Sequence, residues 1–254
     1  MKSKCSVMDG IIRMWKKIGE TPLQTLSRAR DTYNIAADIK ACYTGRLDPM
    51  AQGVIVILFG EEIHRAPEFN SRDKTYQFQA ILGVSTDSYD AMGRINKVHD
   101  ITYAQAKQYL NNILQLTGQL DQPMPPCSSY RYKGKPLWMH HRAGTLPSVL
   151  PKKKVHVYEV DALCPNPIYM TLGQYRKECL DDIGDVTDPE ERDGVFPLKL
   201  IKGDWKACDK NVVLYRVLLR AHVSAGTYIR SLVHDTGNAT GIPAHAARIT
   251  RISL

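Results

Sequence analysis

The chain has 254 residues, of which 43% are hydrophobic and 24% charged, and its formal net charge is +8. This composition is typical of a globular protein long enough to bury a substantial core. It excludes a membrane-spanning helix, because no apolar run approaches the roughly 18 residues that such a helix needs. The N-terminal segment lacks the pattern of a secretory signal and the six cysteines are scattered. We therefore expect an intracellular, non-secreted protein with reduced thiols, in the cytoplasm, the nucleus or a mitochondrion.

Hydrophobic periodicity and turn residues predict the elements of the first half of the chain. In order, these are a strand at 10–18, a helix with Thr21 as N-cap and Pro22 in its first turn, a buried strand at 54–59, a strand at 74–82, and a helix at 101–118 that ends on Gly118. No Cys/His grouping has the spacing of a metal site, and neither type of phosphate-binding glycine loop occurs. We therefore expect neither a metal ion nor an organic cofactor.

The second half is predicted in the same way. In order, we expect a rigid proline connection at 121–126, a short helix from near Pro136, a strand at 154–163, an irregular acidic segment to about 205, a long strand at 211–223, and a helix that begins within 226–241. Strands outnumber helices and their order is mixed. The predicted fold is α+β, a mixed or antiparallel sheet with flanking helices. We expect a single catalytic domain over residues 1–254 with a solvated acidic insertion at about 164–205.

Basic side chains are concentrated between Gln122 and Tyr158, where no acidic residue occurs. The basic residues are Arg131, Lys133, Lys135, Arg142, Lys152, Lys153 and Lys154, and Tyr130, Tyr132 and Trp138 are interleaved with them. Basic side chains pair with phosphates, and aromatic faces stack on unpaired bases. We interpret this block as an RNA-binding surface, because stacking aromatics suit single-stranded RNA loops better than duplex DNA. The acidic run from Glu178 to Asp193 is typical of a solvated face.

The segment TGRLDPMAQG, residues 44–53, places Asp48 in an Asp-Pro pair with a glycine near each end. By itself this pattern is typical of a surface turn. However, YTGRLDPMAQGVIVILFGE resembles the G-x-L-D-P-x-A-x-G-V-L segment of the TruB family of pseudouridine synthases. KTYQFQAILGVSTDSYDAMGRI, QPMPPCSSYRYKGKPLWMHHRAG and VSAGTYIRSLVHDTG are similar to three further segments of that family, in the same order. This order makes a plain turn the weaker interpretation of Asp48.

The resemblance implies catalytic roles for three residues. Isomerising uridine to pseudouridine cuts a C–N glycosidic bond and forms a C–C bond, which requires no redox cofactor. Asp48 matches the family's catalytic carboxylate, acting either as a nucleophile at C1′ or as a base at C2′. Arg230 matches the arginine that holds this carboxylate ionised and oriented, and a guanidinium suits that role. Tyr76 matches the tyrosine that stacks on the flipped uracil and helps to remove the C5 proton, although its pattern also fits an ordinary core aromatic.

The resemblance also implies RNA contacts, with some departures. Lys16 and Arg131 align with family lysines near the active site and the RNA backbone, and Lys74 precedes Tyr76 in the K-x-Y strand. Tyr43 stands where relatives usually have the histidine associated with base flipping. Lys17 replaces an expected proline. The chain ends at Leu254 directly after AARITRISL, so we expect no C-terminal PUA domain.

These features favour an RNA pseudouridine synthase that flips and isomerises the tRNA T-loop uridine 55. Its expected partner is the tRNA T-arm, with no DNA or membrane partner, and we assume a monomer. Two alternatives remain open at this point. One is a dyskerin-like catalytic subunit that depends on a guide RNA. The other is a non-catalytic RNA-binding protein or RNA chaperone.

Overall fold

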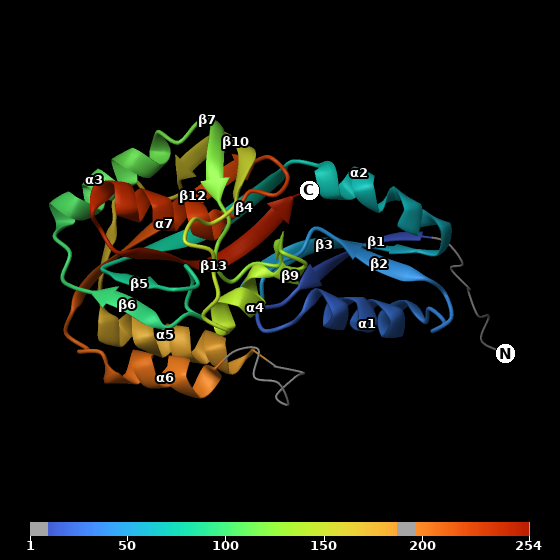
Figure 1. Cartoon of the computed structure of the whole chain (residues 1–254), viewed down its shortest axis with the longest axis horizontal. Helices are drawn as coiled ribbons and strands as arrows, with labels where there is room; N and C mark the ends of the chain where they lie inside the picture. The colour runs from blue at the N-terminus through green and yellow to red at the C-terminus, as the bar shows by residue number, and fades with distance from the viewer. Residues whose placement is uncertain (1–9, 187–196, 254) are drawn as a thin grey trace.

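The computed structural model describes residues 10–186 and 197–253, and its described part is built around one large mixed sheet (Figure 1). The strand order is β1-β3-β13-β4-β12-β10-β7, with β2 paired to β3 and β11 paired to β12. These strands are β1 (Gly10–Lys16), β2 (Ala41–Thr44), β3 (Gln52–Phe59), β4 (Lys74–Leu82), β7 (Gly118–Pro123), β10 (Lys152–Ala162), β11 (Ile168–Thr171), β12 (Val213–Val223) and β13 (Ala244–Ser253). All pairs in this sheet are antiparallel except β13 with β3. The predicted α+β fold with a mixed sheet is confirmed.

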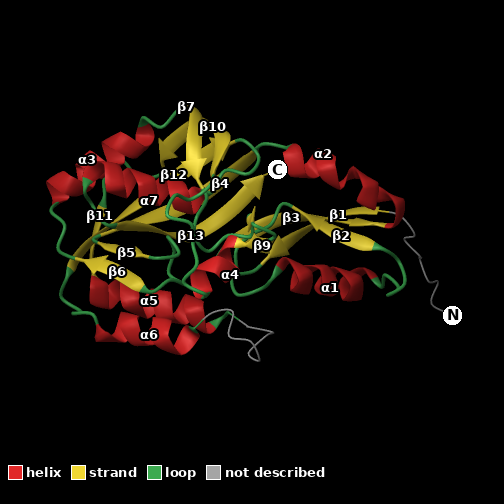
Figure 2. Ribbon diagram, in the orientation of Figure 1, coloured by secondary structure: helices red, strands yellow, loops and turns green. Residues whose placement is uncertain are grey.

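Helices cover the sheet from several sides (Figure 2). They are α1 (Pro22–Tyr33), α2 (Ala66–Ser71), α3 (Tyr103–Leu114), α4 (Leu137–Arg142), α5 (Leu172–Gly184), α6 (Leu198–Ala207) and α7 (Ile229–Thr240), with a 3-10 helix η1 at Gly60–Arg65. Two short hairpins complete the description, β5 (Val84–Thr86) with β6 (Ile95–Val98), and β8 (Arg131–Tyr132) with β9 (Lys135–Pro136). In Figure 1, α5 and α6 lie together on the opposite side of the molecule from α3 and α7.

A recurrent Thr-x-x-Gln pattern starts three of the helices. In α1 the Thr21 side chain accepts a hydrogen bond from the backbone of Gln24, whose side chain accepts one from the backbone of Thr21. The same capping box starts α3 and α5, and it satisfies N–H groups that a helix N-terminus leaves unpaired. The predicted start of α1 is therefore confirmed.

Two predicted boundaries in the middle of the chain are wrong. Helix α3 ends with Gln115 as its C-cap, and Gly118, at φ 88°, begins strand β7 instead. The proline connection predicted at 121–126 also overlaps β7, which pairs with β10 up to Pro123. A proline is tolerated there because β7 is an edge strand, so its other side needs no ladder hydrogen bond.

The prediction of an irregular, solvated segment at about 164–205 is also wrong. Helices α5 and α6 bury Tyr175, Ile183, Ile201 and Trp205 in a second hydrophobic cluster, to which β4, β5 and β12 also contribute. The indole N–H of Trp205 donates to the carbonyl oxygen of Ala91 at 3.1 Å, which ties α6 to the loop between β5 and β6. Residues 187–196 of the acidic run lie outside the described part of the chain.

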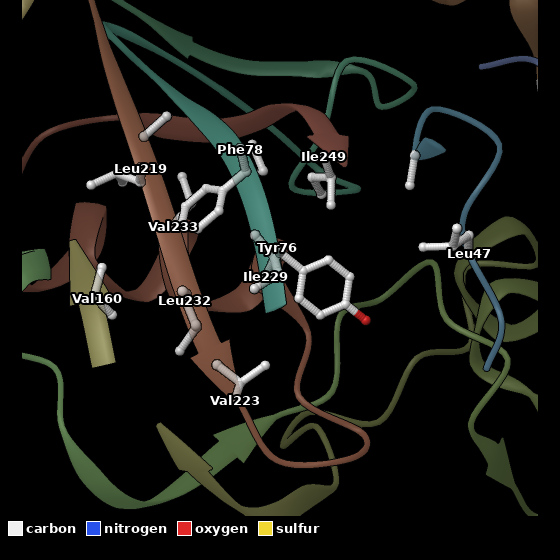
Figure 3. Close-up of a cluster of buried hydrophobic side chains, with 14 of the residues drawn as sticks. Leu47, Tyr76, Phe78, Val160, Leu219, Val223, Ile229, Leu232, Val233 and Ile249 are labelled. Carbon is white, nitrogen blue, oxygen red and sulfur yellow. The ribbon is translucent and has the colours of Figure 1, made fainter. Parts of the chain in front are cut away.

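The main core packs helices α1, α3 and α7 against the sheet (Figure 1), and Figure 3 shows a part of it. Phe78 of β4, Leu219 of β12 and Val233 of α7 pack together there. Tyr76 continues the same face of β4, because alternate residues of a strand point to one side. Its ring joins the cluster while its hydroxyl points away from Phe78 and Val233 (Figure 3). Leu47 and Ile249 belong to the same cluster, so the ring of Tyr76 lies within the core and not at its end.

Candidate active site

The loop that carries Asp48 connects β2 to β3 and lies against the last strand, β13. Gly45 and Gly53 have φ angles of 65° and 122°, which L-residues with a side chain rarely adopt. A Cβ atom on Gly53 would lie 2.2 Å from the carbonyl oxygen of Arg251. The two glycines are therefore required for the loop to pack closely on β13.

Two buried basic residues hold this loop from beneath. Nζ of Lys16 donates to the carbonyl oxygens of Pro49 at 3.3 Å and Ala51 at 2.6 Å. Arg251 donates to Gly45 O at 2.8 Å and to Val54 O at 2.7 Å. Burial lowers the pKa of Lys16 to about 8, although Asp48 opposes that shift.

Lys16 does not lie on the surface that an RNA-binding role requires. Its exposed fraction is 0%, so its ammonium group faces the backbone of the Asp48 loop instead of a phosphate. The structure makes it a positioning residue for that loop. The amino-acid sequence shows that residue 16 is a lysine, but it does not show on which side of β1 the side chain lies.

Asp48 and Arg230 form an ion pair in which Nε lies 2.8 Å from Oδ2. The Arg230 side chain is 2% exposed, whereas that of Asp48 is 37% exposed. The other guanidinium nitrogens donate to Ser88 O at 2.6 Å and to Cys127 O at 3.1 Å. The guanidinium is thus fixed on all sides within the protein, and the carboxylate that it orients reaches solvent. The pair predicted from the motifs is formed.

Asp90 is a second carboxylate beside Arg230, and the sequence prediction gave it no role. Its Oδ2 lies 3.5 Å from Nε of Arg230, and its Oδ1 accepts hydrogen bonds from Ser88 Oγ and the backbone of Met92. Burial raises the pKa of Asp90, and Arg230 opposes this shift. Burial alone would lower the pKa of Arg230, but Asp48 and Asp90 more than offset it and leave that pKa raised. Asp90 is the second of two aspartates in the STDSYDAMG segment, so the motif itself contains the signal.

Asp48, Tyr76 and Arg230 line one cavity of about 290 Å³. Tyr76 is 7% exposed, and burial raises the pKa of its phenol while the guanidinium of Arg251 acts in the opposite direction. The phenol is therefore protonated at neutral pH. A second cavity of about 760 Å³ adjoins the first, because both are lined by Arg46, Leu47, Asp48 and Ser129. Asp48 stands where the two cavities meet.

Only part of the predicted RNA-binding set lies at these cavities. Lys74 and Lys153 line the smaller one, and burial lowers the pKa of Lys74 to about 8. Tyr43 and Arg142 line the larger one. Arg131, Lys133 and Lys135 are exposed on the β8–β9 hairpin, whose turn residues Lys133 and Gly134 both have positive φ angles.

Strand β10 separates the three consecutive lysines of the basic block. Lys153 donates to Ala225 O at 3.1 Å and faces the smaller cavity. Lys152 and Lys154 point to the opposite face, because neighbouring residues of a strand alternate. Burial raises the pKa of Asp235 in α7 to about 6, and the positive charge of Lys152 opposes that shift. The structure therefore brings Lys153 to the cavity of Asp48 and leaves Lys152 and Lys154 outside both cavities. Within residues 10–186 and 197–253, no helix is long and apolar enough to cross a membrane.

Comparison with known proteins finds relatives that share one name. The chain is 28% identical over 255 residues to tRNA pseudouridine synthase B of Pseudoalteromonas translucida, covering 100% of this chain and 64% of the relative. It is 29% identical over 245 residues to tRNA pseudouridine synthase B of Dechloromonas aromatica, covering 96% of this chain and 64% of the relative. The chain thus spans slightly less than two thirds of the length of these relatives.

Solved structures share the fold. A chain of a Cbf5-Nop10-Gar1 complex superposes with a TM-score of 0.55 at 18% identity, over 96% of this chain and 48% of that chain. A chain of an archaeal box H/ACA sRNP Nop10-Cbf5 complex gives 0.53 at 18% identity, over 96% and 47%. Residues 30–173 match the family described as TruB family pseudouridylate synthase (N terminal domain). Because this match covers more than half of the sequence, the chain belongs to the TruB family of pseudouridylate synthases.

Proposed function

We propose that this chain is an RNA pseudouridine synthase that acts on uridine 55 in the T-loop of tRNA inside the cell. The observation that carries the proposal is the single carboxylate of Asp48, held by a buried arginine and facing the same cavity as Tyr76. Among the described residues that line this cavity, Asp48 supplies the one carboxylate, which fits this isomerisation, whereas glycoside hydrolysis uses a pair of carboxylates on either side of the bond. The name shared by the curated relatives supports tRNA as the substrate.

In the proposed reaction, the target nucleotide leaves its stack and enters the cavity, at a cost of about a few kcal/mol. Asp48 assists at the ribose while the C–N bond to the uracil breaks. The detached base turns and its C5 bonds to the anomeric carbon. The C5 proton then leaves, and the phenol of Tyr76 is placed at the cavity wall to help remove it. N1 of the uracil, freed from the ribose, takes up a proton, so the product has the same composition as uridine.

Charge around the cavity supports RNA as the ligand. Lys74 and Lys153 lie at the wall of the smaller cavity, and Arg142 lies at the larger one. Lys74 is 5% exposed and its Nζ donates to the carbonyl oxygens of Asn70 and Arg72, whereas the ammonium group of Lys153 and the guanidinium group of Arg142 can contact phosphates of a bound RNA. Such contacts make affinity fall steeply with salt concentration. Tyr43, at the larger cavity, offers an aromatic face on which a base can stack.

The test uses a tRNA transcript labelled with tritium at C5 of its uridines. We expect the wild-type chain alone to release tritium, and Asp48→Asn to release none while it still binds the transcript. Asp161→Asn is the matched control, because Asp161 forms an exposed ion pair with Arg220 away from the cavities. A transcript with cytidine at position 55 tests the site and should release none.

The other outcomes distinguish the alternatives. Release only after a guide RNA is added would mean a guide-dependent subunit. Tight, salt-sensitive binding by wild type and Asp48→Asn without release from any RNA would mean a non-catalytic RNA-binding protein. Tritium release from the cytidine-55 transcript would mean that the enzyme modifies another uridine.

A further inference from the structure

A thiol, an imidazole and a carboxylate form a continuous chain beside the proposed site. Sγ of Cys127 lies 3.4 Å from Nδ1 of His141, and Nε2 of His141 lies 3.2 Å from Oδ2 of Asp87. All three residues line the cavity of about 760 Å³. The proposed uridine isomerisation uses none of these three side chains.

The three groups come from separate segments, and the fold holds each of them in place. Cys127 follows Pro125 and Pro126 in a turn, and its carbonyl oxygen accepts a hydrogen bond from Arg230 at 3.1 Å. His141 lies in helix α4. Asp87 Oδ1 accepts a hydrogen bond from the backbone of Arg94 at 2.8 Å. The His141 and Asp87 side chains are each 26% exposed, so a small solute can reach them from the cavity.

This arrangement is that of an activated nucleophile. A carboxylate at Nε2 fixes the proton on that nitrogen, which leaves Nδ1 to accept the proton of the thiol. The hydrogen bonds to Asp87 and Cys127 raise the pKa of His141 to about 10, although burial opposes them. Two further titratable groups act on Cys127: the buried Arg230, which adds positive charge, and Tyr89, whose pKa burial raises to about 12 and which is therefore neutral.

Two simpler roles do not fit the geometry. A metal ion needs ligands that converge on one point, but these three groups lie in line, and the described residues contain no group of three or more His, Cys, Asp or Glu side chains that could hold an ion. A merely packed cysteine would be shielded by apolar neighbours, as Cys179 is at 1% exposure. Cys127 instead lines a cavity and contacts a charged imidazole.

We propose that Cys127 is a modification site that reacts with low-molecular-weight disulfides. In the reaction, the Cys127 thiolate attacks one sulfur of the disulfide and its S–S bond breaks. A new S–S bond joins Sγ of Cys127 to one half of the reagent. The other half leaves as a thiolate and takes up a proton, so Cys127 is oxidised to the disulfide level while that half is reduced to a thiol. An excess of free thiol reverses the exchange.

A group attached at Cys127 would occupy the larger cavity next to Asp48. The same cavity is lined by Tyr43, Arg142 and Trp138, so a tripeptide-sized adduct would exclude RNA from it. This consequence rests on the proposed function, because it assumes that RNA enters the cavity. The reactivity of the thiol does not depend on that assumption and is measured without RNA.

The first experiment follows alkylation of the reduced chain by iodoacetamide between pH 5 and pH 9, with each cysteine quantified by peptide mass spectrometry. Cys164 and Cys208 are internal controls, since both are free and of intermediate exposure. At pH 6 we expect Cys127 to react at least about tenfold faster than either, because Nδ1 of His141 lies 3.4 Å from its sulfur and can take up the thiol proton. Equal rates and equal pH profiles for the three cysteines would overturn the proposal.

The variants form a matched pair on helix α4. His141→Gln removes the base and should return Cys127 to the profile of Cys164. His140→Gln alters the adjacent ring, which contacts Thr145 and Tyr132 O instead of the thiol, and should leave Cys127 fast. If His141→Gln folds poorly, Asp87→Asn should also slow Cys127 at pH 6. If Cys127 is still alkylated rapidly in both variants, His141 and Asp87 do not activate its thiol.

The second experiment treats the chain with glutathione disulfide and measures both the adduct mass and the affinity for a tRNA transcript. We expect one adduct at Cys127, at least about tenfold weaker RNA binding, and recovery of both after reduction. The affinity of Cys127→Ser should not change on treatment. An adduct at Cys127 with unchanged affinity would overturn the effect on RNA, whereas absence of the adduct would overturn the modification site itself.

Discussion

Nε of Arg230 lies 2.8 Å from Oδ2 of Asp48, although 182 positions separate the two residues in the sequence. The two side chains differ sharply in exposure, at 2% for Arg230 and 37% for Asp48. The same guanidinium also faces the buried carboxylate of Asp90 at 3.5 Å. The arginine thus neutralises one buried acid and orients a second acid toward the cavity, which couples the stability of the fold to the geometry of the site.

Replacing Arg230 with Met should therefore destabilise the protein and abolish activity. The change leaves Asp90 buried without its partner, and breaking a buried pair in this way costs about 3–5 kcal/mol. Urea denaturation measures this cost at neutral pH. Arg220→Met is the control, because Arg220 pairs with Asp161 on the surface, and an exposed pair contributes only about 0–1 kcal/mol. Similar losses in the two variants would contradict the buried-pair interpretation.

Tyr76→Phe should separate the packing of this ring from its chemistry. The ring stays in the core, so RNA affinity should stay within about twofold. Loss of the hydroxyl should slow tritium release by roughly 10²- to 10⁴-fold if it assists removal of the C5 proton. Tyr109→Phe is the control, because Tyr109 is buried and bonds Val233 O at 3.0 Å away from both cavities. Full activity in Tyr76→Phe would mean that another group removes the C5 proton.

Elements with strong local signals could be predicted from the sequence. The Thr21 capping box and the apolar run at 54–59 specify a helix start and a buried strand through neighbouring residues alone. The sequence does not predict helices α5 and α6, because their many charged residues obscure the apolar helix face that carries Tyr175 and Trp205. That side becomes apolar core only when it meets β5 and β12, which are distant in sequence.

The site shows the same division between residue type and placement. Motif order identified Asp48 and Arg230, and the structure brings them together. However, the sequence does not show where the side chain of a lysine points. It therefore predicts an RNA contact for Lys16, which is buried under the Asp48 loop. Residue type alone does not show that Asp90 is buried beside Arg230, so the sequence prediction gives it no role.

The packing of α6 can be tested by Trp205→Ala. Trp205 is fully buried and its indole N–H bonds Ala91 O, so truncation should cost about 3–5 kcal/mol in the free energy of unfolding. Leu200→Ala on the same helix is the control, because Leu200 is 54% exposed and surface changes usually stay within about 0.5 kcal/mol. A Trp205→Ala chain as stable as Leu200→Ala would restore the view of this segment as a solvated insertion.

Lys153 and Lys154 offer a matched pair for the RNA surface. Lys153 faces the cavity with Asp48, so Lys153→Ala should weaken RNA binding and reduce the slope of log K against log salt by about 1. Lys154→Ala, on the opposite face of β10, should change the slope much less. Filter binding at several salt concentrations measures both. A larger effect of Lys154→Ala would place the RNA on the other face of the sheet.

His245 should make the protein less stable in acid. Its Nδ1 lies 2.9 Å from Val84 O and its Nε2 lies 2.7 Å from the Tyr175 hydroxyl. A carbonyl oxygen only accepts, so Nδ1 carries the proton and the buried ring is neutral. Burial lowers the pKa of His245 from 6.5 to about 4, although the hydrogen bond to Val84 opposes this shift.

The sign of the pH effect follows from these two pKa values. Between about pH 6.5 and pH 4 the unfolded chain binds a proton that the folded chain does not, so stability falls as the pH falls through this window, by up to about 3 kcal/mol for this residue. His245→Gln should be less stable than wild type at pH 7.5 but should lose less on acidification. His64→Gln is the control, because His64 is exposed and pairs only weakly with Glu61 at 3.7 Å. Urea midpoints at pH 7.5, 6 and 5 measure all three proteins, and parallel losses in wild type and His245→Gln would mean that another group causes the acid sensitivity.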